Sequence, residues 1–295
     1  MPIHDDLGKR MKEYYEQIPK TKLMRRTPVA IRLDGKAFHT FTRGFQKPFD
    51  EILIKTMQKT MKYLCENIQG CVLGYTQSDE ITLILVDYKK LNSSAWFDYE
   101  IQKMCSIAAS MATMAFNKSF EKNVIEYVDS VSCLQDFDIE EKYLHTLESA
   151  LRKGAMFDAR VFNIPKEEVT NLIYWRQLDC MRNSVSMVGQ ANFSHRELQN
   201  KSRNDIKEML LAKGINWEEL PIYLQCGSCC IKEKYFIPCE NGKDIKYPEG
   251  CSDPMTDDEI EYGVWRTHWI IDREIPIFKN EGREYIEKLI NFNGE

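Results

Sequence analysis

The stretch from residue 29 to residue 39 reads Val-Ala-Ile-Arg-Leu-Asp-Gly-Lys-Ala-Phe-His. It begins with a short apolar run that contains two β-branched residues and follows a proline, a pattern that predicts a β-strand. Asp34 would then lie at the end of that strand. Gly35 can adopt a positive φ or let a ligand approach the backbone, and the N–H groups from Lys36 to His39 could bind a phosphate. A strand that ends in a plain Asp-Gly turn explains the same residues, so both readings stay open here.

A second stretch, residues 71–86, holds two strand-like runs around Gln77-Ser78-Asp79-Glu80. This pattern predicts a hairpin whose tip carries two acids, although Ser-Asp is also common in ordinary solvated turns. Asp34 and Asp79 would each lie at the end of neighbouring strands, where two carboxylates can share one hard cation. Such oxygens suit Mg²⁺, which takes further ligands from water and substrate phosphates. Two Mg²⁺ ions can serve an in-line phosphoryl displacement.

Three motifs occur in a fixed order along the chain. They are Arg-Leu-Asp-Gly-Lys-Ala-Phe-His at 32–39, Lys-Pro-Phe-Asp at 47–50 and Tyr-Thr-Gln-Ser-Asp-Glu at 75–80. Together they resemble the tRNA(His) guanylyltransferase family, and within it the bacterial Thg1-like branch of 3′-to-5′ RNA polymerases. Segments at 43–45, 157–162 and 175–179 extend the similarity over most of the first 185 residues.

The resemblance implies that Asp34 and Asp79 are catalytic and bridge two Mg²⁺ ions, with the Gly35 carbonyl as a further ligand. Glu80 would point to the strand face opposite Asp79 and support the site, and Asp50 would act as a helix cap nearby. In the family, a basic pair followed by Ser-Lys binds a second triphosphate at the start of the helix after the hairpin. In the corresponding stretch of this chain, residues 98–103, only Lys103 matches that motif. The residues expected to bind ATP, GTP or another nucleoside triphosphate are Gly35, Lys36, Ala37, Phe38, His39, Lys47, Ser78 and Lys103.

The order of predicted elements gives the fold class. Apolar spacing predicts a helix over 49–68, small residues favour a buried helix over 97–120, and 157–164 reads as a fourth strand. A β-α-β-β-α-β order matches the ferredoxin-like arrangement of the polymerase palm, which the resemblance also implies. The prediction is therefore α+β: an antiparallel palm-like sheet with flanking helices and an appended, mostly helical C-terminal region.

Other segments complete the predicted organisation. Residues 7–17 and 167–182 favour helices, whereas 121–153 show little pattern and are expected to form a long excursion. We expect a palm-like catalytic domain over 1–182 and a C-terminal extension over 183–295 that packs on it. A short β-rich tail is expected near the C-terminus.

The composition limits the possible partners. The 295 residues carry a net charge of −5, which is unusual for an RNA binder because phosphate contacts need Lys and Arg. Local basic patches matter more than the total, so RNA remains compatible. No apolar run reaches the length of a membrane span and the first residues are charged, so we expect a cytoplasmic enzyme without membrane contact. The residues expected to contact RNA are Arg25, Arg26, Arg182 and Asn183.

The chain has ten cysteines, and in a protein without a secretory signal they are expected to be reduced thiols. Cys226 and Cys229 have the spacing of zinc ligands, with Cys230, Cys239 and Cys251 nearby, but no second Cys-x-x-Cys follows. Free buried thiols are therefore the favoured interpretation and zinc the alternative.

The sequence after Asp179-Cys180 departs from the family pattern. Enzymes of the family that act on tRNA(His) carry His-x-Asn-Asn there, whereas this chain has Met181-Arg182-Asn183-Ser184. The departure favours template-dependent repair of 5′-truncated tRNA, in which ATP or GTP activates the 5′ end and the 3′-hydroxyl of an incoming nucleotide attacks it. Three alternatives stay open: addition of G at position −1 of tRNA(His), a palm-type nucleotide cyclase, and a catalytically silent RNA-binding protein. The resemblance also implies a homotetramer.

Overall fold

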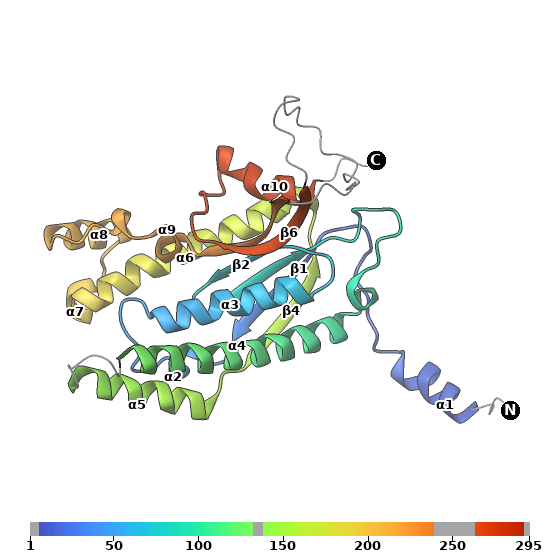
Figure 1. The fold of residues 1–295 in the computed structure, drawn as a ribbon, viewed down its shortest axis with the longest axis horizontal. Helices are drawn as coiled ribbons and strands as arrows, with labels where there is room; N and C mark the ends of the chain where they lie inside the picture. Colours follow the sequence, from blue (N-terminus) through green and yellow to red (C-terminus); the bar gives the residue numbers. More distant parts are fainter. Residues whose placement is uncertain (1–5, 132–137, 239–262, 292–295) are drawn as a thin grey trace.

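A six-stranded antiparallel sheet forms the centre of the computed structural model, which describes residues 6–131, 138–238 and 263–291 (Figure 1). The strand order is β4-β1-β3-β2-β5-β6. The strands are β1 (Val29–Gly35), β2 (Cys71–Gln77), β3 (Glu80–Leu85), β4 (Phe157–Asn163), β5 (Ser228–Pro238) and β6 (Gly263–Asp272). The first four strands have the order 4-1-3-2 of the ferredoxin-like arrangement, which confirms the predicted fold class.

Helices cover both faces of this sheet because alternate residues of its strands are apolar on both sides. One face of β1, with Ile31 and Leu33, packs against α3 (Glu51–Asn67) and α4 (Ile101–Val131). The other face of the sheet packs against α6 (Val169–Asn192) and α10 (Glu284–Ile290). The sheet therefore separates two apolar cores.

The region 121–153 differs from its prediction as an excursion. α4 continues through it as far as Val131, and α5 occupies Asp138–Lys153. α5 is amphipathic: its buried residues Tyr143, Leu147 and Ala150 follow a helical spacing and join the core under α4. The prediction failed because the many charged residues on the exposed face of α5 masked that narrow apolar stripe.

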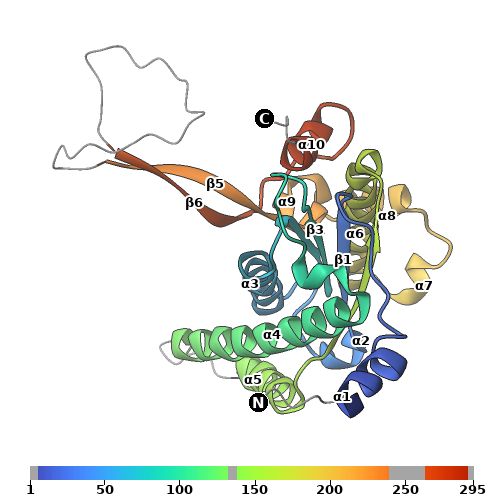
Figure 2. The ribbon, with the colours of Figure 1, turned by 90° about the vertical axis from the view of Figure 1, so that its right-hand side faces the viewer.

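The C-terminal part adds both helices and strands. Its short helices are α7 (His195–Leu198), α8 (Arg203–Ala212) and α9 (Ile222–Cys226), and its strands β5 and β6 extend the central sheet beside β2. Figure 2 shows the long β5–β6 pair projecting away from the body of the molecule. The division at 182/183 stays a prediction; that position lies inside α6.

Two short elements lie before the main helices. The N-terminal α1 (Asp6–Met11), continued by a π-helical turn over Lys12–Glu16, confirms the helix expected at 7–17 and extends away from the sheet in Figure 1. α2 (Phe38–Phe41) is a single turn directly after β1. Within the described ranges, we find no helix with the length and apolar character needed to cross a membrane.

Candidate active site

The end of β1 and the β2–β3 turn form one edge of the sheet. In the ladders, Asp34 lies opposite Glu80 of β3 and opposite Asp158 of β4, so these three side chains share the sheet face that α6 covers. Ser78 and Asp79 form the tight turn between β2 and β3, with Ser78 at φ 50°. The Gly35 N–H donates to the Asp79 carbonyl at 3.1 Å. This hydrogen bond ties the two predicted carboxylate-bearing segments to each other.

The two carboxylates at this edge are only weakly neutralised by the protein. The nearest cation to Asp34 is Arg160, whose Nη2 lies 4.0 Å from Oδ2. Burial raises the pKa of Asp79, a 3.0 Å hydrogen bond from the Ser78 hydroxyl lowers it, and the charge of Asp34 raises it again. The net effect is a raised pKa, which means that the ionised form of Asp79 is disfavoured. A divalent cation between the Asp34 and Asp79 side chains would offset their repulsion and favour the ionised form of Asp79.

Gly35 has a steric reason to lack a side chain, and a positive φ is not that reason. It is not among the residues with positive φ. Instead, a Cβ on Gly35 would lie 2.2 Å from the ring of Phe38, which folds back onto the strand end. The positive φ of this segment belongs to Ala37, at 55°. The Lys36 N–H donates to the Met156 carbonyl at 2.8 Å, so the expected phosphate-binding run of N–H groups loses its first member.

A cavity of about 490 Å³ opens beside these segments. It brings together most of the residues expected to bind nucleotide, because β1 with α2, the segment before α3 and the β2–β3 turn all meet there. Lys36 and Lys103 are not among its lining residues, and Lys103 lies near the start of α4 over the ring of Phe97. The lining residues are Gly35, Ala37, Phe38, His39, Thr42, Phe45, Gln46, Lys47, Pro48, Asp50, Leu53, Ser78, Asp79 and Met187.

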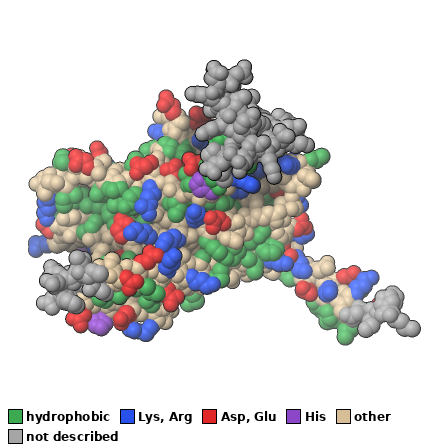
Figure 3. Space-filling model, viewed as in Figure 1, with side chains coloured by type: hydrophobic (Ala, Val, Ile, Leu, Met, Phe, Trp, Pro, Cys, Tyr) green, Lys and Arg blue, Asp and Glu red, His purple; other side chains and the backbone are tan. Residues whose placement is uncertain are grey.

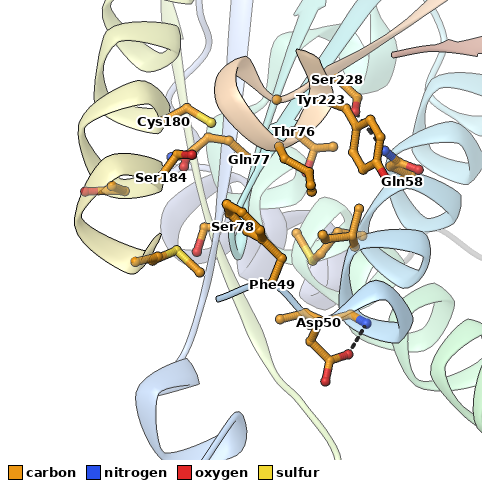
Figure 4. A pocket seen from close by; sticks show the side chains of 17 residues that line it. Phe49, Asp50, Gln58, Thr76, Gln77, Ser78, Cys180, Ser184, Tyr223 and Ser228 are labelled. Atoms are coloured by element: carbon orange, nitrogen blue, oxygen red, sulfur yellow. Dashed lines mark hydrogen bonds between the residues drawn. The ribbon is translucent and has the colours of Figure 1, made fainter. Parts of the chain in front are cut away.

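A second, smaller pocket of about 100 Å³ adjoins the first (Figure 4). The two share Asp50, Leu53, Ser78 and Met187. Its walls come from α3, the end of β2, α6 and α9, and its polar groups include a 2.7 Å hydrogen bond from Gln58 Nε2 to the Ser228 hydroxyl. The pocket therefore extends the cavity into the body of the protein.

Asp50 acts as the N-cap of α3, as predicted. Its Oδ1 accepts from the Leu53 N–H at 3.0 Å, and its Oδ2 accepts from the Gln46 N–H at 3.1 Å and from the Tyr143 hydroxyl at 2.6 Å. Burial, and then the hydrogen bond to Asp50, raise the pKa of Tyr143. Asp50 thus fixes both the start of α3 and the loop that carries Lys47 into the cavity.

Glu80 forms an ion pair with an arginine that the sequence did not indicate as its partner. Arg176 of α6 donates from Nε to Glu80 Oε1 at 2.6 Å and from Nη2 to Oε2 at 2.8 Å, and also pairs with Asp179 at 2.9 Å. Both Glu80 and Arg176 are buried. Burial raises the pKa of Glu80, and the charges of Arg176 and Arg32 act against it. Nothing in the spacing of residues 80 and 176 signals this pair; only the packing of α6 on the sheet brings them together.

The residues expected to contact RNA are dispersed. Arg25 lies just before β1, at the end of the strand opposite to Asp34, which we call the far end. Its guanidinium pairs there with Asp87 at 2.6 Å and with Asp98 at 3.2 Å. The neighbouring Arg26 donates to the Leu91 carbonyl at 3.5 Å. Arg182 pairs with Asp179 at 2.6 Å, and Asn183 lines the smaller pocket. On the face drawn in Figure 3, Lys and Arg side chains lie interspersed with Asp and Glu.

The cysteines near β5 lie on two sides of the sheet. Cys226, Cys229 and Cys230 are buried free thiols, with Cys226 and Cys229 in one apolar core and Cys230 in the other. Adjacent strand residues point to opposite faces, so Cys229 and Cys230 cannot share one ion. Cys239 and Cys251 lie outside the described residues. In the described ranges, no group of three or more His, Cys, Asp or Glu side chains is placed to hold a metal.

Comparison with known proteins agrees with this architecture of a six-stranded antiparallel sheet flanked by helices. Residues 8–165 match the family described as Thg1: tRNAHis guanylyltransferase. The chain belongs to this family. Members of the family are tRNA guanylyltransferases, and the chain is accordingly a nucleotidyltransferase.

Individual relatives cover most of the chain. Uncharacterized protein R259 of Acanthamoeba polyphaga mimivirus is 30% identical over 253 residues, 82% of both chains. The tRNA(His) guanylyltransferase of Schizosaccharomyces pombe is 27% identical over 236 residues, 75% of this chain and 80% of its own length.

Two solved structures of a bacterial tRNA(His) guanylyltransferase (Thg1)-like protein also resemble the chain. The complex with ATP has a TM-score of 0.74 and 36% identity and covers 97% of this chain and 100% of its own. The complex with GTP has a TM-score of 0.70 and 34% identity, and covers 97% and 99%.

Proposed function

We propose that this chain adds nucleotides in the 3′-to-5′ direction to tRNA 5′ ends, as a Mg²⁺-dependent, template-dependent repair enzyme for 5′-truncated tRNA. The observation that supports the proposal is the cavity at this edge of the sheet, which Gly35 and Asp79 line together with His39, Lys47 and Ser78. Asp34 does not line the cavity itself, but it directly precedes Gly35 in β1, and its charge contributes to the raised pKa of Asp79. The proposal includes a cytoplasmic homotetramer, as the family resemblance implies.

The donor set at this edge fits Mg²⁺. Asp34 and Asp79 offer hard carboxylate oxygens, and Gly35, whose N–H donates to the Asp79 carbonyl, offers a backbone oxygen directly after Asp34. Burial and the charge of Asp34 raise the pKa of Asp79, so a bound cation would favour its ionised form. These three residues would hold the metal. When bound, Mg²⁺ would lower the pKa of an attacking hydroxyl and neutralise the charge of a triphosphate.

The protein's own groups would position the reactants. Lys47 and His39 line the cavity from two different segments, and the N–H groups of Ala37 to His39 face no backbone acceptor within the described chain. A triphosphate held there would place its α-phosphate beside the carboxylate edge. Alignment of a hydroxyl and a phosphate in this way supplies much of the rate enhancement in phosphoryl transfer. ATP or GTP would first transfer its nucleoside monophosphate to the 5′-phosphate of the tRNA and release pyrophosphate. The 3′-hydroxyl of an incoming nucleotide would then attack that 5′-phosphate and displace the nucleoside monophosphate.

The preference for repair rests on α6. Met181 packs against both the α6–α10 core and the cluster formed with α8, and the Ser184 hydroxyl accepts from the Trp217 indole N–H at 2.9 Å. Neither side chain offers the imidazole and amide groups of the His-x-Asn-Asn pattern. Without them, base pairing to the opposing strand would supply the selectivity.

The decisive experiment is a matrix of truncated tRNAs, each with every opposing template base and every nucleoside triphosphate. Addition that follows the template base across several tRNAs supports the proposal. Addition of G to tRNA(His) alone, whatever the opposing base, would identify a −1 guanylyltransferase instead. Cyclic nucleotide formed from a triphosphate without RNA would identify a cyclase. A chain that binds tRNA and nucleotide without any turnover would be a silent binding protein.

A further inference from the structure

We propose that a cationic groove between α2 and α5 binds backbone phosphates of the RNA substrate. This inference rests on the proposed function in so far as it takes RNA to be the substrate. It assigns the contact to residues that lie neither in the nucleotide cavity nor among the arginines predicted from the sequence.

The groove has a volume of about 380 Å³, and seven of its nine lining residues carry polar groups that can bind anions. Three cations, Arg43, Lys142 and Lys153, and the imidazole of His145 surround it. Three hydroxyl groups complete the polar lining. The lining residues are Thr40, Phe41, Arg43, Lys142, His145, Thr146, Ser149, Ala150 and Lys153.

The groove lies on the other side of α2 from the nucleotide cavity. His39 lines the cavity and the next residue, Thr40, lines the groove, so a single turn of helix separates the two. The Lys153 Nζ donates to the Thr40 carbonyl at 3.4 Å. A Cβ on Gly44, which has φ +91°, would lie 3.1 Å from Thr146. These contacts dock α2 and its exit onto α5 and fix the groove relative to the active edge.

The charges of the groove are largely uncompensated. In the part of the chain that the structure describes, no carboxylate pairs with Arg43, Lys142 or Lys153. Two acids do face His145, since Glu141 lies 3.9 Å and Glu148 lies 3.7 Å from its ring nitrogens. Glu148 also pairs with Arg152 at 3.7 Å.

This distinguishes the groove from the basic residues at the far end of β1. There, Lys22 and Arg25 pair with Asp98, and Arg25 also pairs with Asp87. In a chain of net charge −5, three unpaired cations around one concave surface form a local anion site. Its open shape and its place one helical turn from the nucleotide cavity fit a polymer that runs past the site. A phosphodiester backbone provides successive anionic groups for such a surface.

The test compares two double variants that remove the same charge. Lys142→Ala/Lys153→Ala removes two groove cations, and Lys62→Ala/Lys122→Ala removes two lysines that form exposed i,i+4 pairs outside the groove. The dissociation constant of a labelled tRNA that lacks its first nucleotide is measured by anisotropy from 50 to 300 mM salt, and KM for ATP is measured separately. Helix content and Tm of all proteins are recorded.

We expect the groove variant to bind tRNA roughly tenfold more weakly near 0.1 M salt, and its slope of log K against log salt to be smaller by about 1 to 2. The control variant should match the wild type, and KM for ATP should not change. An unchanged tRNA affinity and salt slope would overturn the groove assignment alone. A raised KM for ATP with unchanged tRNA affinity would overturn it in favour of a free-nucleotide phosphate site. Failure of the wild type to bind any tRNA would overturn the proposed function as well.

Discussion

The two ends of the β1–β3 pair both gather aspartates, but the protein treats them in opposite ways. At the far end, Asp87 is almost fully buried and accepts from Arg25 Nε at 2.6 Å and from the Arg26 N–H at 2.8 Å. At the near end, Asp34 keeps 38% of its side-chain surface exposed and its closest cation is 4.0 Å away. Asp79 beside it has a raised pKa.

The difference separates structure from function. A carboxylate whose hydrogen-bonding capacity is filled by arginine and backbone N–H groups stabilises the fold but has no ligand position left. A pair of carboxylates left under-neutralised at a cavity costs stability and retains the capacity to bind a cation. The far end therefore stabilises the fold, and the near end keeps the capacity to bind a cation that the proposed function requires.

The largest expected effect follows from replacing one aspartate at each end of the β1–β3 pair by asparagine. Asp34→Asn should reduce nucleotide addition at least about a thousandfold, because it removes a charged metal ligand. Asp87→Asn should leave the chemistry of the folded enzyme intact but lower the free energy of unfolding by about 1–3 kcal/mol, because it weakens a buried charge-assisted bond to Arg25. Single-turnover rates and urea unfolding of both variants measure the two effects.

A third variant controls for charge alone. Asp158 lies opposite Asp34 in the ladder, is exposed and pairs with Arg160 at 3.7 Å. Asp158→Asn should change neither the rate of nucleotide addition nor the free energy of unfolding substantially. Near-wild-type addition by Asp34→Asn under saturating Mg²⁺ would contradict the proposed metal site.

The next effect concerns the buried pair behind the active edge. Arg176→Met should lower the free energy of unfolding by about 3–5 kcal/mol, because the Glu80 carboxylate is left buried without its bidentate partner. The double variant Glu80→Gln/Arg176→Met should recover part of that loss, since the buried carboxylate charge is gone. Recovery should be incomplete because Arg32, 3.5 Å from Glu80, then loses its carboxylate partner. If the single and double variants were equally unstable, Arg176 would contribute through packing and not through charge.

The sequence predicted the parts of this architecture that local pattern encodes. The strand at 29–35 and the hairpin at 71–86 follow from β-branched runs and their flanking turns. Asp50 was recognisable as a cap because it directly precedes the apolar helical spacing of α3. The pairing of Asp34 with the hairpin tip followed from placing both acids at strand ends, and the structure brings the two segments into contact.

Longer-range features were not predictable in this way. The bond from Trp217 to Ser184 and the bidentate pair of Arg176 with Glu80 join residues that are 33 and 96 positions apart. The groove between α2 and α5 depends on the helix at 138–153, whose narrow apolar stripe the charged residues concealed. The extension of the sheet by β5 and β6 also depends on pairing with β2, which no local signal specifies.

The smallest expected effect tests whether the ionised Asp79 carboxylate at the near end lowers the stability of the folded protein. The folded-state pKa of Asp79 is raised above its unfolded value, so the folded protein binds that proton more tightly. The contribution of Asp79 to the free energy of unfolding is therefore fully present at pH values below its pKa in the unfolded chain. It is lost as the pH rises through the pKa of Asp79 in the folded protein. Asp79→Asn, which keeps a neutral side chain at every pH, should raise Tm slightly at pH 7–8 in the presence of EDTA. The gain should disappear near pH 3.5.

Thermal melts of the wild type, Asp79→Asn and Asp158→Asn from pH 3.5 to 8 measure this, and Asp158→Asn should show no comparable pH-dependent gain. Mg²⁺ with ATP should then reverse the order, because a ligand that binds only the folded wild type raises its Tm by mass action. An Asp79→Asn variant that is less stable than the wild type at pH 7–8 in EDTA would show that the turn depends on the carboxylate. The contrast between a stabilising far end and a costly near end would then be wrong.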